Sequence, residues 1–312
     1  MNPELKKVSV SDFANHFGTS KNDFDDEIKK MINEIDFSYY ELSESENLKT
    51  ILEILKRIEL DEQKIASKER ENVWQKGWNE NYTEFIKSNY NLDTLIPKFI
   101  RPNQLIRLNR RFIKPANNLF EFDFFRVFRY WLFSKYFSEF DSIYEFGCGT
   151  GMNLVELSKL YPEKKLYGSD FVKSSVNLVN EIAKAFDLNL KGFQFDMINP
   201  NFDFKIDSNS IFYTFGALEQ LGSQTEKMLR YILKQKPKLI VHLEPTIELY
   251  DENNLIDYLA IKFHKKRGYT EGYLPMLKKL EKEGEIKIVK EKRLEFGSLL
   301  MEGFTYFIWK IS

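Results

Sequence analysis

The stretch SIYEFGCGTGMNL, residues 142–154, decides which fold this sequence can adopt. The residues up to Phe146 favour a strand, the glycines at 147, 149 and 151 favour a tight loop, and the residues after them favour a helix. This order is typical of nucleotide-binding turns. The spacing excludes two of them, because Met152 replaces the third glycine of a dinucleotide fingerprint and no Gly-Lys-Ser/Thr of a P-loop follows. Glu145 also disfavours a phosphate and suits a ligand's ammonium or hydroxyl groups.

The composition indicates a chain that can bury a large core. Of its 312 residues, 43% are hydrophobic and 15% aromatic, and the formal net charge is −1. That charge argues against a generic nucleic-acid binder, which carries a basic excess. Cys148 is the one cysteine, so no intrachain disulfide can form. No run has the character of a signal peptide or a membrane span, so we expect a soluble, cytoplasmic protein.

From Ser142 onward, short β-rich runs alternate with helical stretches. This alternation predicts a parallel sheet covered by helices on both faces. The last two β-rich runs, EIKIVKEKRL and FTYFIWKI, have no helix between them and should pair antiparallel. We therefore predict a helical N-terminal extension or cap over residues 1–118 and an α/β domain over residues 119–312. Residues 246–283 form a helical insert of that domain, placed over its ligand pocket.

The motif EFGCGTG, residues 145–151, resembles the first motif of class I S-adenosylmethionine-dependent methyltransferases. The resemblance covers roughly residues 120–312. It implies a Rossmann-like, doubly wound sheet of seven strands that ends in an antiparallel hairpin. It also implies S-adenosylmethionine as the cofactor, with the amino-acid end of that molecule on the glycine loop. The cofactor-binding residues that it implies are Glu145, Gly147, Cys148, Gly149, Gly151, Asp170, Phe171, Asp196, Met197, Thr214, Phe215 and Gly216.

The implied contacts suit the residue types at their positions. Asp170 ends the second strand in LYGSD, and a carboxylate there can accept hydrogen bonds from both ribose hydroxyls. By the same resemblance, Phe171 would lie against the adenine. Asp196 would accept a hydrogen bond from the adenine amino group, with Met197 beside it.

The segment TFGALEQLG, residues 214–222, is similar to the part of the family that passes behind the methionine moiety. Many members of the family have Glu-His there, and Glu219–Gln220 in this chain removes one candidate base. Cytosine C5 methylation is excluded, because it needs a cysteine nucleophile in this segment. Methylation of base amino groups is disfavoured, because the Asn/Asp-Pro-Pro-aromatic motif of those enzymes is missing.

The candidate catalytic residues are His242, Glu244 and His264. His242 lies at the end of a predicted strand in IVHLEP, and Glu244 two residues later should point to the same side. We predict that His242 is a general base and that Glu244 orients it or binds the substrate. The alternative is a hydrogen-bonded histidine under a loop. His264, in KFHKKRGY, is either a lid residue or an exposed residue on a basic turn. No bound metal is predicted.

The predicted function is that of a methyltransferase acting on a small polar acceptor, a class that includes phosphorylated and nucleotide-linked molecules. We favour O-methylation of a sugar or a glycan precursor, as in polysaccharide biosynthesis. One alternative is a protein or RNA methyltransferase whose basic segment 98–114 binds the macromolecule, and another is a non-catalytic cofactor-binding protein with this fold. The basic segment is either an anion site or a solvated face. Trp74 and Trp78 are either a carbohydrate-stacking platform or buried anchors.

Overall fold

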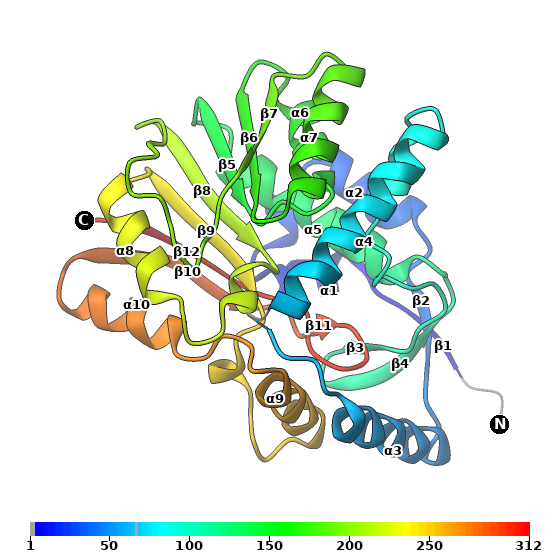
Figure 1. Cartoon of the computed structure of the whole chain (residues 1–312). Coiled ribbons are helices and arrows are strands. Elements are labelled where there is room, and N and C mark those ends of the chain that lie inside the picture. Colours follow the sequence, from blue (N-terminus) through cyan, green and yellow to red (C-terminus); the bar gives the residue numbers. More distant parts are fainter. Residues whose placement is uncertain (1–3, 66–67) are drawn as a thin grey trace.

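The computed structural model describes residues 4–65 and 68–312. Its large sheet consists of β5 (Ser142–Phe146), β6 (Lys165–Asp170), β7 (Leu190–Gln194), β8 (Ser210–Phe215), β9 (Leu239–Glu244), β10 (Ile286–Arg293) and β12 (Thr305–Ile311). The order across the sheet is β10-β12-β9-β8-β5-β6-β7 (Figure 1). Strands β5 to β9 pair in parallel, whereas β12 is antiparallel to both β9 and β10. The predicted doubly wound, seven-stranded sheet with a terminal antiparallel hairpin is therefore confirmed.

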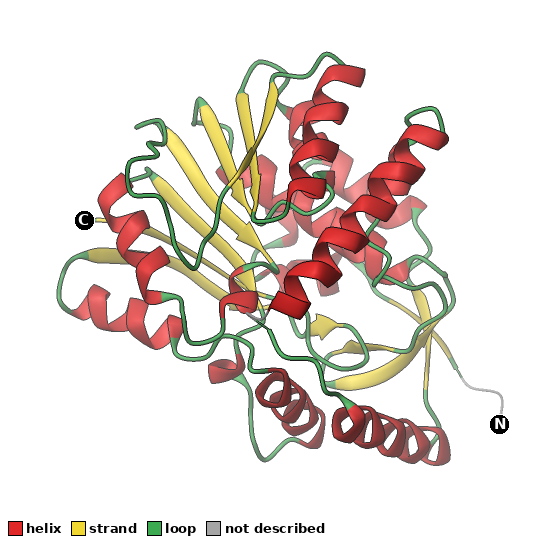
Figure 2. Cartoon of the chain, in the orientation of Figure 1, coloured by secondary structure: helices red, strands yellow, loops and turns green. Residues whose placement is uncertain are grey.

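Helices cover both faces of this sheet, as Figure 2 shows. Successive side chains of a strand point to opposite sides, so Ile143 and Ile211 enter one buried cluster, while Tyr144 and Phe212 enter another. The first cluster includes residues of α5 (Phe120–Tyr136), α6 (Met152–Leu160) and α7 (Lys173–Ala185). The second includes residues of α8 (Glu226–Gln235) and α10 (Tyr273–Lys282). Burial on both faces explains why apolar residues occupy consecutive positions in strands such as β8 and β9.

A second, smaller sheet takes four of its strands from the N-terminal part of the chain, where the sequence predicted a helical extension, and its fifth from near the C-terminus. Its order is β1-β2-β4-β3-β11. The strands are β1 (Leu5–Lys7), β2 (Ser38–Glu41), β3 (Ile106–Leu108), β4 (Arg111–Pro115) and β11 (Phe296–Gly297). They are short and partly charged, so their pattern is weak. The hairpin of β3 and β4 turns at Asn109 and Arg110, both with positive φ, as a two-residue turn of the type I′ class requires. The predicted helical extension over residues 1–118 therefore also contains strands.

The helices of the N-terminal part are α1 (Val10–Phe17), α2 (Asp26–Glu34), α3 (Glu44–Leu60) and α4 (Lys68–Lys87). Helix α4 packs against α7 and lies to the right of the large sheet in Figure 1. The insert expected at 246–283 contains α9 (Leu255–Arg267) and α10, and α9 packs beside α3. No helix in the described ranges is long and apolar enough to cross a membrane. A domain boundary at residue 118 stays a prediction, because the small sheet combines strands from before this residue with β11, which comes after it.

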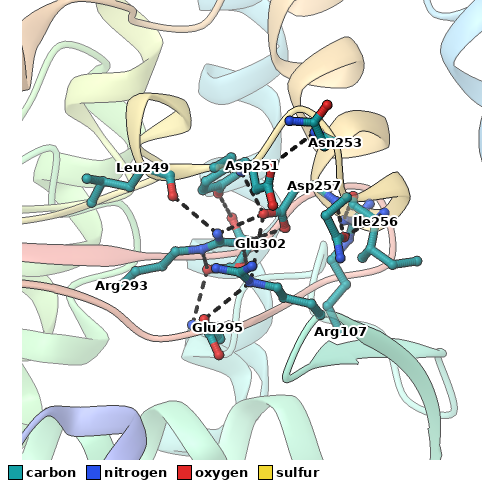
Figure 3. Close-up of polar contacts among 12 residues, drawn as sticks. Arg107, Leu249, Asp251, Asn253, Ile256, Asp257, Arg293, Glu295 and Glu302 are labelled. Atoms are coloured by element: carbon teal, nitrogen blue, oxygen red, sulfur yellow. Dashed lines mark hydrogen bonds and ion pairs between the residues drawn. The ribbon is translucent and has the colours of Figure 1, made fainter.

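A buried ionic cluster joins the small sheet, α9 and the terminal hairpin (Figure 3). The Arg293 guanidinium donates from Nη2 to Asp257 Oδ1 at 2.6 Å and from Nε to Glu302 Oε1 at 2.6 Å. Arg107 of β3 donates to the carbonyls of Leu299, Ile256 and Leu300. All four charged side chains are buried, so each depends on its partners for the solvation that water would supply.

Removing one cation from this cluster should be strongly destabilising. Arg293→Met removes the cation that donates to both buried carboxylates, so the free energy of unfolding should fall by about 3–5 kcal/mol. The matched control is Arg230→Met, which breaks an exposed pair with Glu226 on α8 and should change it by less than about 1 kcal/mol. Urea denaturation measures both. Equal losses in the two variants would contradict a supporting role for the cluster.

Candidate functional site

A cavity of about 410 Å³ lies at the carboxyl ends of β5, β6 and β8, under α4. Strand β5 pairs with β6 on one side and with β8 on the other, so the cavity lies where the order of the sheet reverses. Ligands of doubly wound folds bind at this position. Of the sequence-predicted cofactor residues, those that line the cavity are Gly147, Asp170, Phe171, Asp196, Met197 and Gly216. The others, Glu145, Cys148, Gly149, Gly151, Thr214 and Phe215, are not among its lining residues.

The glycine loop presses against the loop that follows β8. Gly147 has a φ of 80°, and a Cβ placed there would lie 2.3 Å from Cβ of Ala217. The loop also turns its backbone N–H groups inward. Those of Gly147 and Cys148 donate to the Ser169 carbonyl, and that of Gly149 donates to Asp170. A phosphate-binding loop needs such groups free for the ligand, so this loop is built for something else.

The Cys148 thiol is buried, with its sulfur 3.6 Å from Oγ of Ser175. Burial raises the pKa of this thiol well above its ordinary value, so it stays protonated and is a poor nucleophile.

Asp170 presents a partly satisfied carboxylate to the cavity. Its Oδ2 accepts from the Gly149 N–H at 3.1 Å, and its Oδ1 accepts from the Val172 N–H at 3.2 Å. Burial raises the pKa of Asp170 to about 6, although these N–H groups oppose the shift. Each carboxylate oxygen has two lone pairs, so both can accept a further hydrogen bond from a ligand. A ligand with two adjacent hydroxyl groups matches this arrangement.

Asp196 is exposed and holds its own loop as well as lining the cavity. Its Oδ1 accepts from the Ile198 N–H at 2.8 Å and its Oδ2 from the Asn199 amide at 3.1 Å. Phe171, Met197 and Ile198 also line the cavity, so apolar surface adjoins both carboxylates. A flat, partly polar group fits such a wall.

Glu145 lies beneath the glycine loop and is 1% exposed. Its Oε1 accepts from the Asn153 amide of α6 at 2.6 Å. Burial raises the pKa of Glu145 to about 8. Glu145 is not among the lining residues of the cavity, and its contact with a cofactor stays a prediction.

His242 and Glu244 lie behind the loop that follows β8, outside the cavity. His242 is fully buried, with Nδ1 2.9 Å from Thr214 Oγ1 and Nε2 3.2 Å from the Tyr273 hydroxyl. Burial lowers the pKa of His242 to about 3 and raises the pKa of Glu244 to about 7. The structure thus corrects the expectation of a base beside the ligand. It shows the alternative, a hydrogen-bonded histidine under a loop.

The remaining predicted residues are also internal. His264 is 1% exposed, where an exposed turn was an alternative, and its Nε2 lies 2.8 Å from the Thr270 carbonyl. Burial lowers the pKa of His264 to about 4. Phe215 packs on Phe304, with ring centroids 4.6 Å apart.

Helix α4, part of the predicted N-terminal cap, provides the roof of the cavity. Arg70, Trp74 and Trp78 are spaced by four residues and form a column. The Arg70 guanidinium lies 4.5 Å from the Trp74 ring centroid, and the two indoles stack at 5.1 Å. Arg70, one turn before, and Trp78, one turn after, both pack on the Trp74 ring, so this ring is not free for a sugar to stack on. Trp78 is 8% exposed and covers Gly149, as expected of a buried anchor.

The basic segment 98–114 is largely engaged within the protein. Arg107 is buried, Lys98 pairs with Glu84 at 2.7 Å, and Arg111 pairs with Glu41 at 3.1 Å. These contacts offset much of the positive charge that a macromolecular anion would need. Among the described residues, no group of three or more His, Cys, Asp or Glu side chains is arranged to hold a metal ion.

No protein-family model matches the chain, and no curated protein matches it. Similar solved structures include the YcgJ protein from Bacillus subtilis, at a TM-score of 0.38 and 14% identity, over 49% of this chain and 65% of that chain. They also include a SAM dependent methyltransferase from Aquifex aeolicus, at a TM-score of 0.40 and 16% identity, over 57% of this chain and 86% of that chain.

A third similar structure is the plantazolicin methyltransferase BpumL in complex with a desmethylPZN analog and SAH. Its TM-score is 0.40 and its identity 16%, over 59% of this chain and 80% of that chain. Similarities of this degree say nothing about the chemistry of the site. The seven-stranded sheet with its terminal antiparallel hairpin is the fold that the resemblance to class I methyltransferases implies.

The contact between the two loops should not tolerate a side chain at Gly147. Gly147→Ala adds a Cβ 2.3 Å from that of Ala217 at a φ of 80°, so the free energy of unfolding should fall by about 2–4 kcal/mol. The control is Gly77→Ala in α4, where an added Cβ has open space. That change should stabilise the protein by about 1 kcal/mol. A Gly147→Ala variant as stable as the wild type in urea would contradict the close contact.

Proposed function

We propose that the chain is an S-adenosylmethionine-dependent methyltransferase that acts on a small polar acceptor. The observation that carries the proposal is the carboxylate of Asp170, held at the end of β6 with both oxygens able to accept from a ligand. The cofactor's ribose carries two adjacent hydroxyl groups, which match this carboxylate. The inward-turned N–H groups of the glycine loop oppose a pyrophosphate ligand instead.

The rest of the cavity accommodates the other parts of this cofactor. The adenine would lie among Phe171, Met197 and Ile198, within reach of Asp196. The amino-acid end would lie at Gly147 and beside the loop after β8. When bound, S-adenosylmethionine supplies a methyl group that its sulfonium centre has already activated. The protein's part is therefore to bind, to orient and to exclude water, and the roof formed by α4 serves the last of these.

We further propose that the acceptor is a sugar or a glycan precursor, methylated on oxygen. A sugar hydroxyl benefits from a general base, and His242 is not placed to supply one. Glu71 of α4 lines the cavity beside Arg70, on the roof rather than on the adenine side. This carboxylate is the replacement candidate for the base. The paired charges of segment 98–114 make a protein or RNA acceptor the weaker alternative.

The cofactor assignment is tested by binding of S-adenosylhomocysteine in a calorimeter. Asp170→Asn removes the charged acceptor and should weaken binding about 10- to 100-fold. Asp203→Asn, on an exposed loop, is the control and should leave the affinity unchanged. Hydroxyl groups donate best to the ionised carboxylate, whose pKa is about 6. Wild-type affinity should therefore fall about tenfold from pH 7 to pH 5, and more than that of the Asn variant. No binding by the wild type would end the proposal.

The acceptor assignment is tested by transfer of a labelled methyl group to a panel of sugars and nucleotide-linked sugars. If Glu71 is the base, Glu71→Gln should lower kcat about 100-fold on the acceptor that the panel identifies. Affinity for S-adenosylhomocysteine should stay within twofold of the wild-type value. Binding without turnover on any acceptor would favour a non-catalytic protein, and a full rate for Glu71→Gln would place the base elsewhere.

A further inference from the structure

The loop after β8 forms the floor of the cavity and is held from behind by one carboxylate. This loop, residues 216–221, contributes Gly216, Ala217, Gln220 and Leu221 to the lining. It contains a short 3-10 helix, η3 (Leu218–Leu221), whose first N–H groups have no partner within the helix. Those groups point away from the cavity, toward Glu244.

Glu244 accepts four hydrogen bonds and is 3% exposed. Its Oε1 accepts from Thr214 Oγ1 at 2.6 Å and from the N–H groups of Ala217 at 3.2 Å and Leu218 at 3.0 Å. Its Oε2 accepts from the Glu219 N–H at 3.1 Å. Every partner is a donor, so the ionised carboxylate, which only accepts, satisfies all of them. Glu244 thereby fixes three consecutive backbone positions of the floor.

The hydrogen bonds behind Glu244 have one consistent direction. The Thr214 hydroxyl has a single proton, and it donates that proton to Glu244. It must then accept from Nδ1 of His242, 2.9 Å away, so this ring nitrogen carries the proton of the imidazole. Nε2 of the neutral ring is left as an acceptor, and the Tyr273 hydroxyl donates to it at 3.2 Å. With Glu244 ionised, the network therefore assigns the tautomer of His242.

The neighbouring groups agree with a neutral His242. Phe307 and Trp309 of β12 pack on its ring, with centroids at 5.1 and 6.2 Å, and neither carries a charge. The acids of the surroundings are Glu244, which the Thr214 hydroxyl separates from the ring, and Glu219 on η3. Tyr273 begins α10, so the series of bonds runs from the helical insert to the cavity floor.

We propose that Tyr273, His242, Thr214 and Glu244 form a directed hydrogen-bond chain that positions the floor of the cavity for methyl transfer. The inference rests on the proposed function. It makes His242 a positioning residue whose two ring nitrogens join α10 to Thr214. The geometry of Ala217 against Gly147, and with it the seat of the cofactor's amino-acid end, then depends on the placement of α10.

The direction of the chain is tested by nuclear magnetic resonance of protein labelled with ¹⁵N-histidine. His242 should carry its proton on Nδ1 and should not titrate between pH 5 and pH 8. The chain has two other histidines, His16 and His264. Their signals are identified by their loss in His16→Asn and His264→Asn, which leaves the His242 signal. A proton on Nε2, or titration near pH 6.5, would overturn the chain.

The positioning role is tested by two substitutions at one residue. Thr214→Val keeps the shape and removes the hydroxyl, so it should weaken binding of S-adenosylhomocysteine about tenfold. It should also shift the amide proton signals of Ala217, Leu218 and Glu219. Thr214→Ser restores the hydroxyl. Its affinity should be within twofold of the wild-type value, and its three amide signals should lie close to their wild-type positions. Wild-type affinity in Thr214→Val would overturn the role.

A third variant keeps the test decisive if Thr214→Val does not fold. Tyr273→Phe removes the first donor at the far end of the chain. The same three amide signals should move, although the Tyr273 hydroxyl bonds to His242 and not to these residues. Unmoved signals would overturn the proposal. If wild-type protein fails to bind S-adenosylhomocysteine, the proposed function is lost, whereas the tautomer of His242 still decides whether the chain exists.

Discussion

The cavity depends on the close contact between the glycine loop after β5 and the loop after β8, which leaves no room for a side chain at Gly147. The backbone at Gly147 lies so close to Ala217 that a Cβ would be 2.3 Å from its neighbour. The loops meet because β5 and β8 are parallel neighbours, and parallel strands end at the same edge of a sheet. On the other side of β5, the end of β6 brings Asp170 to the same edge. The pairing of three strands therefore sets the distance between the glycine loop, the floor and the carboxylate.

The electrostatics of the site follow from the same burial. Water is excluded from the carboxyl groups of Glu145, Asp170, Glu219 and Glu244, which raises their pKa values to between about 6 and about 8. Backbone and side-chain donors hold Asp170 and Glu244 as acceptors. A nearby positive charge favours the ionised form of such groups. The proposed ligand has a sulfonium centre, so its charge and this set of acids stabilise each other.

Local pattern was enough to predict the large sheet and its hairpin, and the family resemblance named six of the residues that line the cavity. Gly147 and Asp170 are specified by their places at strand ends, which a sequence displays directly. The orientation of His242 was different. Alternation along β9 tells which face a side chain joins, but whether a loop covers that face depends on Glu244 binding residues 217–219. The helical spacing of Trp74 and Trp78 likewise could not tell a cavity roof from a core contact.

The small sheet was missed for a reason that also governs how the protein is made. Its strand β3 pairs with β11, a two-residue strand that lies far along the chain at Phe296–Gly297. Arg107 beside it bonds to the carbonyls of Leu299 and Leu300. During synthesis the N-terminal residues leave the ribosome long before these partners exist. The first part of the chain to be translated is therefore among the last to acquire its complete hydrogen bonding. The Arg107 guanidinium stays hydrated until the residues around the terminal hairpin have been synthesised.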